Sequence, residues 1–134
     1  MNAGYSPRPL WQKLGIKPGM RAHQQNAPAA HHDSLLAGAP DAQWPDGPED
    51  ADFIHIFVTE RAVLSRALAQ ALAAMDRDGM IWVSWPKKSA KVPTDVTEDV
   101  IRAECLPMGL VDVKVCAVSE VWSGLKLMIR KELR

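Results

Sequence analysis

The chain has 134 residues, which is enough for one domain with a hydrophobic core that needs no disulfide staples. Its 16 basic and 16 acidic residues give a formal net charge of zero, so the overall charge gives no reason to expect nucleic acid or a membrane as a partner. The hydrophobic fraction of 47% and the charged fraction of 24% are ordinary for a soluble globular protein.

The two cysteines, Cys105 and Cys116, lie far apart in sequence and do not have CxxC spacing. We interpret them as buried thiols rather than as a disulfide or a metal site, which is typical of a reducing compartment. The N-terminal region has no long apolar run, so we expect neither a signal peptide nor a transmembrane helix. These observations predict a cytoplasmic protein.

The first elements are short. Proline at position 9 and glycine at position 15 are typical of the first turn and of the residue after the end of a helix, so Pro9 to Leu14 is predicted to be helical. The turn at Lys17-Pro18-Gly19 leads into Met20 to Gln25, a weak candidate for a strand because most of its side chains are polar.

Residues 26–51 are expected to be irregular or partly disordered. The segment Gly38 to Asp50 holds three prolines, two glycines and four acidic residues, a composition that favours a loop. Two short elements are predicted inside this region. One is a helix from His31 to Ala37, and the other is an edge strand near Gln43 and Trp44.

A βαβ unit follows. Phe53 to Val58 is an apolar run, broken only by His55, that favours a strand covered on both faces. Thr59 is predicted to cap a helix on which Leu64, Leu68, Leu72 and Met75 recur at helical spacing. After Gly79 the apolar run from Met80 to Trp85 is predicted to be a second, parallel strand that stops at Pro86. Trp82 and Trp85 would point to opposite faces of it.

A second helix is predicted after the lysines that follow Pro86. Asp95 and Glu98 have capping-box spacing, and Thr97 is a rival cap. Val100, Ile101 and either Cys105 or Leu106 would form its buried stripe, and Pro107 and Gly109 would end or kink it.

The chain ends in two alternating runs, Val111 to Val118 and Leu125 to Lys131, joined by the short connection Ser119 to Gly124. In the first run one face is assigned Val111, Val113, Val115 and Ala117, and the other face Asp112, Lys114 and Cys116. Such runs favour an antiparallel pair. The predicted fold class is therefore α/β: a single Rossmann-like, three-layer domain over residues 1–134, with a mixed, mostly parallel sheet that ends in an antiparallel hairpin.

Several motifs together resemble a bacterial family of unknown function, DUF3052. They are GYS, LGIKPGM, NAP at 26–28, DFIHIFVT, MIWVSWPKKSAKVPTDVTEDVIR and GLVDVKVCAVSEVWSGLKL. The resemblance is specific from Asp52 to the end and patchy before it. It implies no activity. The order of elements from Phe53 to Lys131 is also similar to the C-terminal half of a Rossmann-like methyltransferase, an analogy of topology that by itself implies no catalysis.

The chain departs from the methyltransferase pattern in its cofactor loop. Such enzymes have a glycine-rich loop after the first strand and an acidic residue after the second strand that holds the ribose hydroxyls. Asn26-Ala27-Pro28-Ala29-Ala30 contains no glycine, and Asp41, Asp46, Glu49 and Asp50 all fall in the unassigned loop. We therefore do not expect a standard adenosylmethionine or dinucleotide site, and the cofactor stays unassigned.

The ligand crevice of an open α/β sheet lies at the carboxyl ends of its strands. Lysines beside the amino end of a helix would suit an anion there. The alternative interpretation is that these lysines form a solvated loop. The predicted ligand-binding residues are Asn26, Thr59, Trp85, Lys87, Lys88, Thr94, Asp95, Thr97 and Trp122.

Other chemistry has less support. His23, His31, His32 and His55 lack the spacing of a metal site, so no metal ligand is predicted. There is no GxSxG elbow and no cysteine in an evident electropositive loop, so no catalytic residue is assigned.

The sequence thus favours a binding module for a small anionic ligand or a protein partner. The alternatives are a divergent methyltransferase-like transferase without the usual glycine-rich loop, and a purely structural role.

Overall fold

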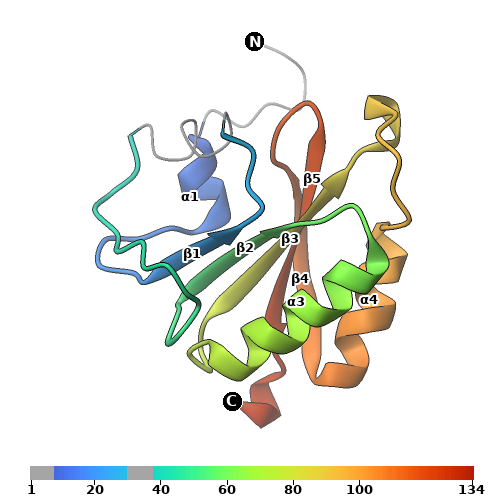
Figure 1. Cartoon of the computed structure of the whole chain (residues 1–134). Coiled ribbons are helices and arrows are strands. Elements are labelled where there is room, and N and C mark those ends of the chain that lie inside the picture. Colours follow the sequence, from blue (N-terminus) through green and yellow to red (C-terminus); the bar gives the residue numbers. More distant parts are fainter. Residues whose placement is uncertain (1–7, 30–37) are drawn as a thin grey trace.

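Five strands form one mixed sheet in the part of the chain that the computed structural model describes, residues 8–29 and 38–134 (Figure 1). The strand order is β1-β2-β3-β5-β4. β1 (Ala22–Gln25), β2 (Phe53–Phe57) and β3 (Met80–Pro86) are parallel. β5 (Trp122–Ile129) pairs antiparallel with both β3 and β4 (Leu110–Ala117). The predicted α/β class and the antiparallel hairpin are confirmed.

Helices cover both faces of this sheet. α3 (Arg61–Ala74) and α4 (Glu98–Cys105) cover one face, and α1 (Leu10–Leu14) lies on the other (Figure 1). The larger core, which includes Leu64, Leu68 and Ile101, fills the space under α3 and α4. A smaller core under α1 contains Leu14, Phe53 and Trp82. Three short 3₁₀ helices complete the elements: η1 (Lys88–Ala90), η2 (Leu106–Met108) and η3 (Lys131–Leu133).

α1 is tied to the sheet by a tryptophan. The Trp82 indole Nε1 donates a buried hydrogen bond of 2.8 Å to the backbone oxygen of Leu14. Gly15 follows in the left-handed conformation with φ 89°, as predicted for the residue that ends the helix. Trp85 packs in the larger core, so the two tryptophans do lie on opposite faces of β3.

The weak strand prediction at Met20 to Gln25 is confirmed as β1, because its backbone pairs with β2 although its side chains are mostly polar. The predicted edge strand near Gln43 and Trp44 is wrong. Gln43 forms only an isolated parallel bridge with Arg21, and Pro45 removes the next donor. The helix predicted from His31 to Ala37 lies outside the described residues.

β2 is buried at all five positions, as its apolar run predicts. His55 is fully buried, and its Nε2 lies 2.7 Å from the Ser84 hydroxyl of the neighbouring strand. The Phe57 ring stacks on His55 at 4.2 Å between centroids and meets Trp122 edge-on at 5.2 Å. An aromatic row therefore extends from β2 to the start of β5.

Gly79 allows the tight return from α3 into β3. A Cβ at this position would lie 2.8 Å from the Ala51 backbone oxygen and 3.0 Å from that of Asp76. Real Cβ atoms do not approach carbonyl oxygens so closely, so glycine is required here for space.

The predicted cap of α3 is wrong, whereas of the two alternatives for α4 the structure confirms Thr97 and not Asp95. The side chain of Thr59 does not cap α3. The N-cap residue of α3 is Glu60, and its side chain makes no capping hydrogen bond. Instead the Arg61 amide donates to Asp95 Oδ1 at 2.7 Å. Asp95 thus caps α3 rather than its own helix, and the Thr97 hydroxyl caps α4 by accepting from the Val100 amide at 3.2 Å.

The strict alternation predicted for Val111 to Val118 is interrupted in β4. Val113 and Val115 are each 49% exposed. β4 is the edge strand, and its register shifts between Asp112 and Lys114, which breaks the strict alternation. In α4 the buried stripe is Ile101 and Cys105, whereas Leu106 is 44% exposed.

Both cysteines are free thiols; Cys105 is buried, as predicted, whereas Cys116 is only half-buried. None of the helices in residues 8–29 and 38–134 has the length and apolar character needed to cross a membrane.

Candidate functional site

The predicted ligand-binding residues divide between two hollows at the carboxyl ends of the strands. The first, which we call the β3–α4 cleft, has a volume of about 670 Å³ and contains Trp85, Lys87, Lys88, Thr94 and Thr97. The second, the β2 hollow, is smaller, at about 230 Å³, and contains Asn26, Thr59 and Trp122. Asp95 lines neither hollow.

The charges around the β3–α4 cleft are unequally paired. Glu98 and Asp99 lie on its rim, and both carboxylates contact Arg102, Asp99 at 3.4 Å. Arg102 also contacts Asp112 at 3.0 Å, and this hydrogen bond holds the pKa of the Asp112 carboxyl below its usual value. Lys87 and Lys88 take part in no ion pair with any described residue. The lysines are therefore the charges in the cleft that lack an opposite charge.

The amino end of α4 faces the same cleft, since Thr97, Glu98 and Asp99 line it. The first amides of a helix have no partner within the helix. In α4 the Thr97 side chain takes the Val100 amide, and the Thr97 backbone oxygen takes the Ile101 amide at 3.0 Å. The preceding amides belong to Glu98 and Asp99, which line the same cleft as Lys87 and Lys88.

Three predicted site residues also make hydrogen bonds that hold the fold together. The Thr94 hydroxyl donates to the Thr59 backbone oxygen at 2.6 Å and accepts from the Val96 amide at 3.0 Å. The Asp95 amide donates to the same Thr59 oxygen at 3.2 Å. Together with the Asp95 cap on Arg61, these bonds join the end of β2 to the loop before α4. We call Thr59, Thr94 and Asp95 the inter-helix clamp.

The β2 hollow has an aromatic wall. Phe57 and Trp122 meet edge-on at 5.2 Å, and Trp122 is half-buried as the first residue of β5. Asn26 has φ 58°, a left-handed conformation that asparagine adopts more readily than most residues, where the chain leaves β1. The small volume and the packed rings leave little room for a ligand.

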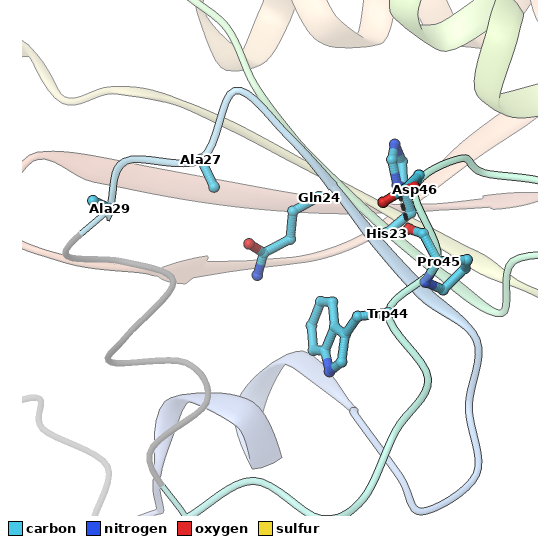
Figure 2. A pocket seen from close by; sticks show the side chains of 7 residues that line it. All are labelled: His23, Gln24, Ala27, Ala29, Trp44, Pro45 and Asp46. Carbon is cyan, nitrogen blue, oxygen red and sulfur yellow. Dashed lines mark hydrogen bonds between the residues drawn. The ribbon is translucent and has the colours of Figure 1, made fainter.

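Sequence reasoning missed a third pocket, the β1 pocket, of about 500 Å³ (Figure 2). It is lined by His23, Gln24, Ala27, Ala29, Trp44, Pro45 and Asp46. His23 and Gln24 are consecutive in β1 and therefore point to opposite faces, so both can line a pocket only at the outer edge of the strand. Figure 2 shows the Gln24 side chain extending toward the Trp44 indole.

The position of Asp46 gives this pocket its polar character. The bridge between Arg21 and Gln43 sets residues 43–46 parallel to the outer edge of β1, and His23 Nδ1 lies 3.4 Å from the Pro45 backbone oxygen. Asp46 follows the end of β1 by about 20 residues, the spacing at which nucleotide-binding folds have a ribose-binding acid. That spacing is the sequence signal that could have found the pocket.

No group of three or more histidine, cysteine or acidic side chains is arranged to hold a metal ion within the described residues. His31 and His32 lie outside them. The fully buried His55 contacts Ser84 and its aromatic neighbours.

Comparisons with known proteins agree with this architecture. Residues 46–131 match the model of a family described as "Protein of unknown function (DUF3052)". No curated protein shows significant sequence similarity to the chain.

Solved methyltransferase structures have the same fold. A protein from Sulfolobus solfataricus, provisionally described as a type 11 methyltransferase, superposes with a TM-score of 0.64 and 12% identity, over 90% of this chain and 89% of the other. A SAM-dependent methyltransferase from Aquifex aeolicus gives 0.58 and 15%, over 90% and 87%. The ribosomal protein L11 methylase of Lactobacillus delbrueckii subsp. bulgaricus gives 0.55 and 12%, over 90% and 74%. At such identities the similarity is one of fold, and it confirms the predicted methyltransferase-like topology.

Proposed function

Because this chain belongs to the DUF3052 family, whose description assigns no activity, we propose a function from its geometry: it binds a small anionic ligand in the β3–α4 cleft. The observation that carries the proposal is the unequal pairing of charge. Arg102 engages Glu98 and Asp99, whereas Lys87 and Lys88 lack ion pairs among the described residues. An anion entering the cleft therefore meets two uncompensated positive charges.

The surrounding backbone supports the same ligand class. Amides at the amino end of a helix attract anions through their unpaired N–H groups and the helix dipole. The cleft lies beyond the carboxyl end of β3, where open α/β sheets bind ligands. Its volume of about 670 Å³ suits a small molecule better than a protein surface. Phosphate and carboxylate groups are the chemistry that lysine and helix amides recognise in common.

Isothermal titration with a panel of nucleotides and phosphorylated metabolites tests this proposal. We expect at least one compound to bind the wild type and to lose about tenfold or more in affinity with Lys87→Ala plus Lys88→Ala, because each lysine gives a charge-assisted hydrogen bond. Lys131→Ala, which removes an exposed lysine in η3, is the control and should bind normally. Undiminished binding by the double variant would reject the assigned cleft.

A second candidate is a divergent transferase that holds a nucleoside cofactor in the β1 pocket. Trp44 and Asp46 favour it, since an indole can stack on a base and a carboxylate can accept hydrogen bonds from ribose hydroxyls. The neighbours of this fold include a SAM-dependent methyltransferase, which makes S-adenosylmethionine the first cofactor to examine. The loop after β1 lacks glycine, so the backbone cannot approach a cofactor as it does in a glycine-rich loop.

Thermal unfolding with S-adenosylhomocysteine separates this candidate from the first. A ligand at about 100 times its Kd stabilises the folded state by about 2.7 kcal/mol, a readily measured rise in Tm. The transferase candidate requires such a rise in Tm in the wild type and a smaller rise in Asp46→Asn. Asp41→Asn, which changes an acid outside the β1 pocket, is the control and should show the same rise as the wild type. If millimolar ligand leaves the Tm of the wild type unchanged, the candidate fails.

A further inference from the structure

Four lysines gather on the α1 face of the sheet, away from the β3–α4 cleft. Lys114 in β4 and Lys126 in β5 lie directly opposite each other in the strand register. Lys13 lies in the last turn of α1 and Lys17 in the turn that follows it. We call Lys13, Lys17, Lys114 and Lys126 the lysine cluster.

The fold fixes these side chains near one another. Lys126 is the register partner of Trp82 in β3, and the Trp82 indole holds the backbone of Leu14 at 2.8 Å. α1 is thereby anchored beside the strand position that carries Lys126. Burial, followed by the charges of Lys114 and Lys17, lowers the pKa of Lys126. Burial raises the pKa of Cys116, and the positive charges of Lys114 and Lys13 act in the opposite direction by lowering it.

The four lysines are not paired with acids in the part of the chain that the structure describes. The ion pairs formed by the described residues involve Arg61, Arg102 and Arg130, and none includes a lysine of the cluster. Like charges directly opposite on neighbouring strands destabilise a sheet. Because Lys126 is half-buried, water screens its repulsion from Lys114 less than it would at a fully exposed position. The folded protein therefore retains an electrostatic cost that a bound anion would remove.

We propose that the lysine cluster is a second anion site, which binds a phosphate-bearing ligand with at least two negative charges. Lysine is a common binder of phosphate as a point charge, and several lysines match a group that carries several charges. None of the three hollows described above is lined by these lysines. The ligand thus lies on an open surface, as an oligophosphate or the sugar-phosphate backbone of a nucleic acid does. Both sources present the same chemistry.

The Tm of the protein without ligand gives the first test. If Lys114 repels Lys126, replacing Lys114 should raise the Tm, whereas if Lys114 makes a stabilising contact, replacing it should lower the Tm. Lys114→Ser should raise the Tm by about 1–4 °C in low salt, since it relieves the repulsion of Lys126. The rise should shrink as added salt screens the charges. A lowered Tm for Lys114→Ser would overturn the proposal, because it would mean that Lys114 already has a stabilising partner.

Binding gives the second test. We expect inorganic triphosphate or a mixed-sequence oligonucleotide to bind the wild type and to lose about tenfold or more in affinity with Lys17→Ser plus Lys114→Ser. The variant Lys87→Ala plus Lys88→Ala, altered on the other face, should bind these probes at the cluster as the wild type does. That control separates failure here from failure of the β3–α4 cleft.

Salt dependence then identifies the source of the phosphate. If all four lysines contact a single nucleic-acid strand, a plot of log K against log salt should have a slope of about −3. If the ligand is a compact oligophosphate, it should displace the oligonucleotide at constant salt, and its affinity should not depend on its chain length. Either result supports the site. Equal affinity for poly-glutamate would overturn the phosphate assignment in favour of an acidic protein partner, and no binding of either phosphate probe would overturn the site.

Discussion

The Cys105 thiol is fully buried between α4 and the sheet. Burial disfavours the thiolate and raises the pKa of Cys105 from 9.0 to about 11. The unfolded chain therefore loses this proton at a lower pH than the folded protein does. As pH rises from about 9 to about 11, the unfolded state is favoured and this contribution to stability is progressively lost.

We predict that Cys105→Ala makes the free energy of unfolding less dependent on pH in this range. Two pKa units correspond to a change of at most about 2–3 kcal/mol in the free energy of unfolding between pH 9 and pH 11. The variant is compared with the wild type at each pH. Urea titrations at several values of pH measure the difference. Cys116→Ala is a useful comparison, because that thiol is half-buried and its pKa is also raised. Parallel pH profiles for the wild type and Cys105→Ala would contradict the prediction.

Some residues were predictable because their role is local. Gly15 was identified from the residues beside it, and Trp82 and Trp85 were assigned to opposite faces from their spacing alone. The role of Asp95 could not be predicted in this way, because the Arg61 amide that its carboxylate accepts from lies 34 positions away in sequence. Its spacing to Glu98 gave an equally good local explanation, and local patterns cannot choose between near and distant donors.

At the scale of elements, the inter-helix clamp joins α3 to the loop that leads into α4. Thr59 receives hydrogen bonds from the Thr94 hydroxyl and the Asp95 amide, while the Asp95 carboxylate caps the first turn of α3. Thr59 lines the β2 hollow and Thr94 lines the β3–α4 cleft, so the clamp joins the walls of the two hollows. Residues expected to form one site therefore line two hollows.

The clamp predicts a specific loss of stability. Asp95→Ala should lower the free energy of unfolding by about 1 kcal/mol, with a range of about 0.5–2, because the Arg61 amide loses its acceptor. Asp95→Asn keeps an acceptor oxygen and should lose less. Chemical denaturation measures both. Glu60→Ala is the control, since Glu60 is exposed and makes no side-chain cap bond; an equal loss in Glu60→Ala would show that the cap is not the cause.

β4 was predicted as an antiparallel strand, and only its strict alternation failed, for a reason of the same scale. Alternation indicates a strand, but burial depends on what covers each face. The bulge between Asp112 and Lys114 interrupts the alternation, and Val113 and Val115 are exposed on this edge strand. No pattern in residues 111–118 shows that β5 inserts between β3 and β4, which leaves β4 at the edge.

At the scale of the whole molecule, one sheet separates two cores of unequal size. The larger core is made by α3, α4 and the strands, whose periodic apolar residues made it predictable. The smaller core depends on α1 and on partly buried residues such as Ala42 and Trp44, from a segment without regular structure. The packing of that side was not predictable, because it is assembled by contacts between distant segments, although α1, β1 and the spacing from β1 to Asp46 can be read from the sequence.

The link between the two layers can be tested at Trp82. Trp82→Phe removes the donor to Leu14 and leaves a small cavity, so we expect a loss of about 2–4 kcal/mol. Hydrogen exchange should show that α1 loses more protection than α3. Trp85→Phe, on the opposite face, is the matched control and should spare α1. Uniform loss of protection in Trp82→Phe would contradict a local role of the hydrogen bond.

The irregular register of β4 also bears on how copies of this protein behave at high concentration. An edge strand with exposed valines is a surface on which a straight strand of another molecule can add. The bulge between Asp112 and Lys114 offsets the backbone groups that such an added strand would have to match. The irregularity that interrupts the alternation of this strand is therefore expected to hinder the addition of a strand from another copy.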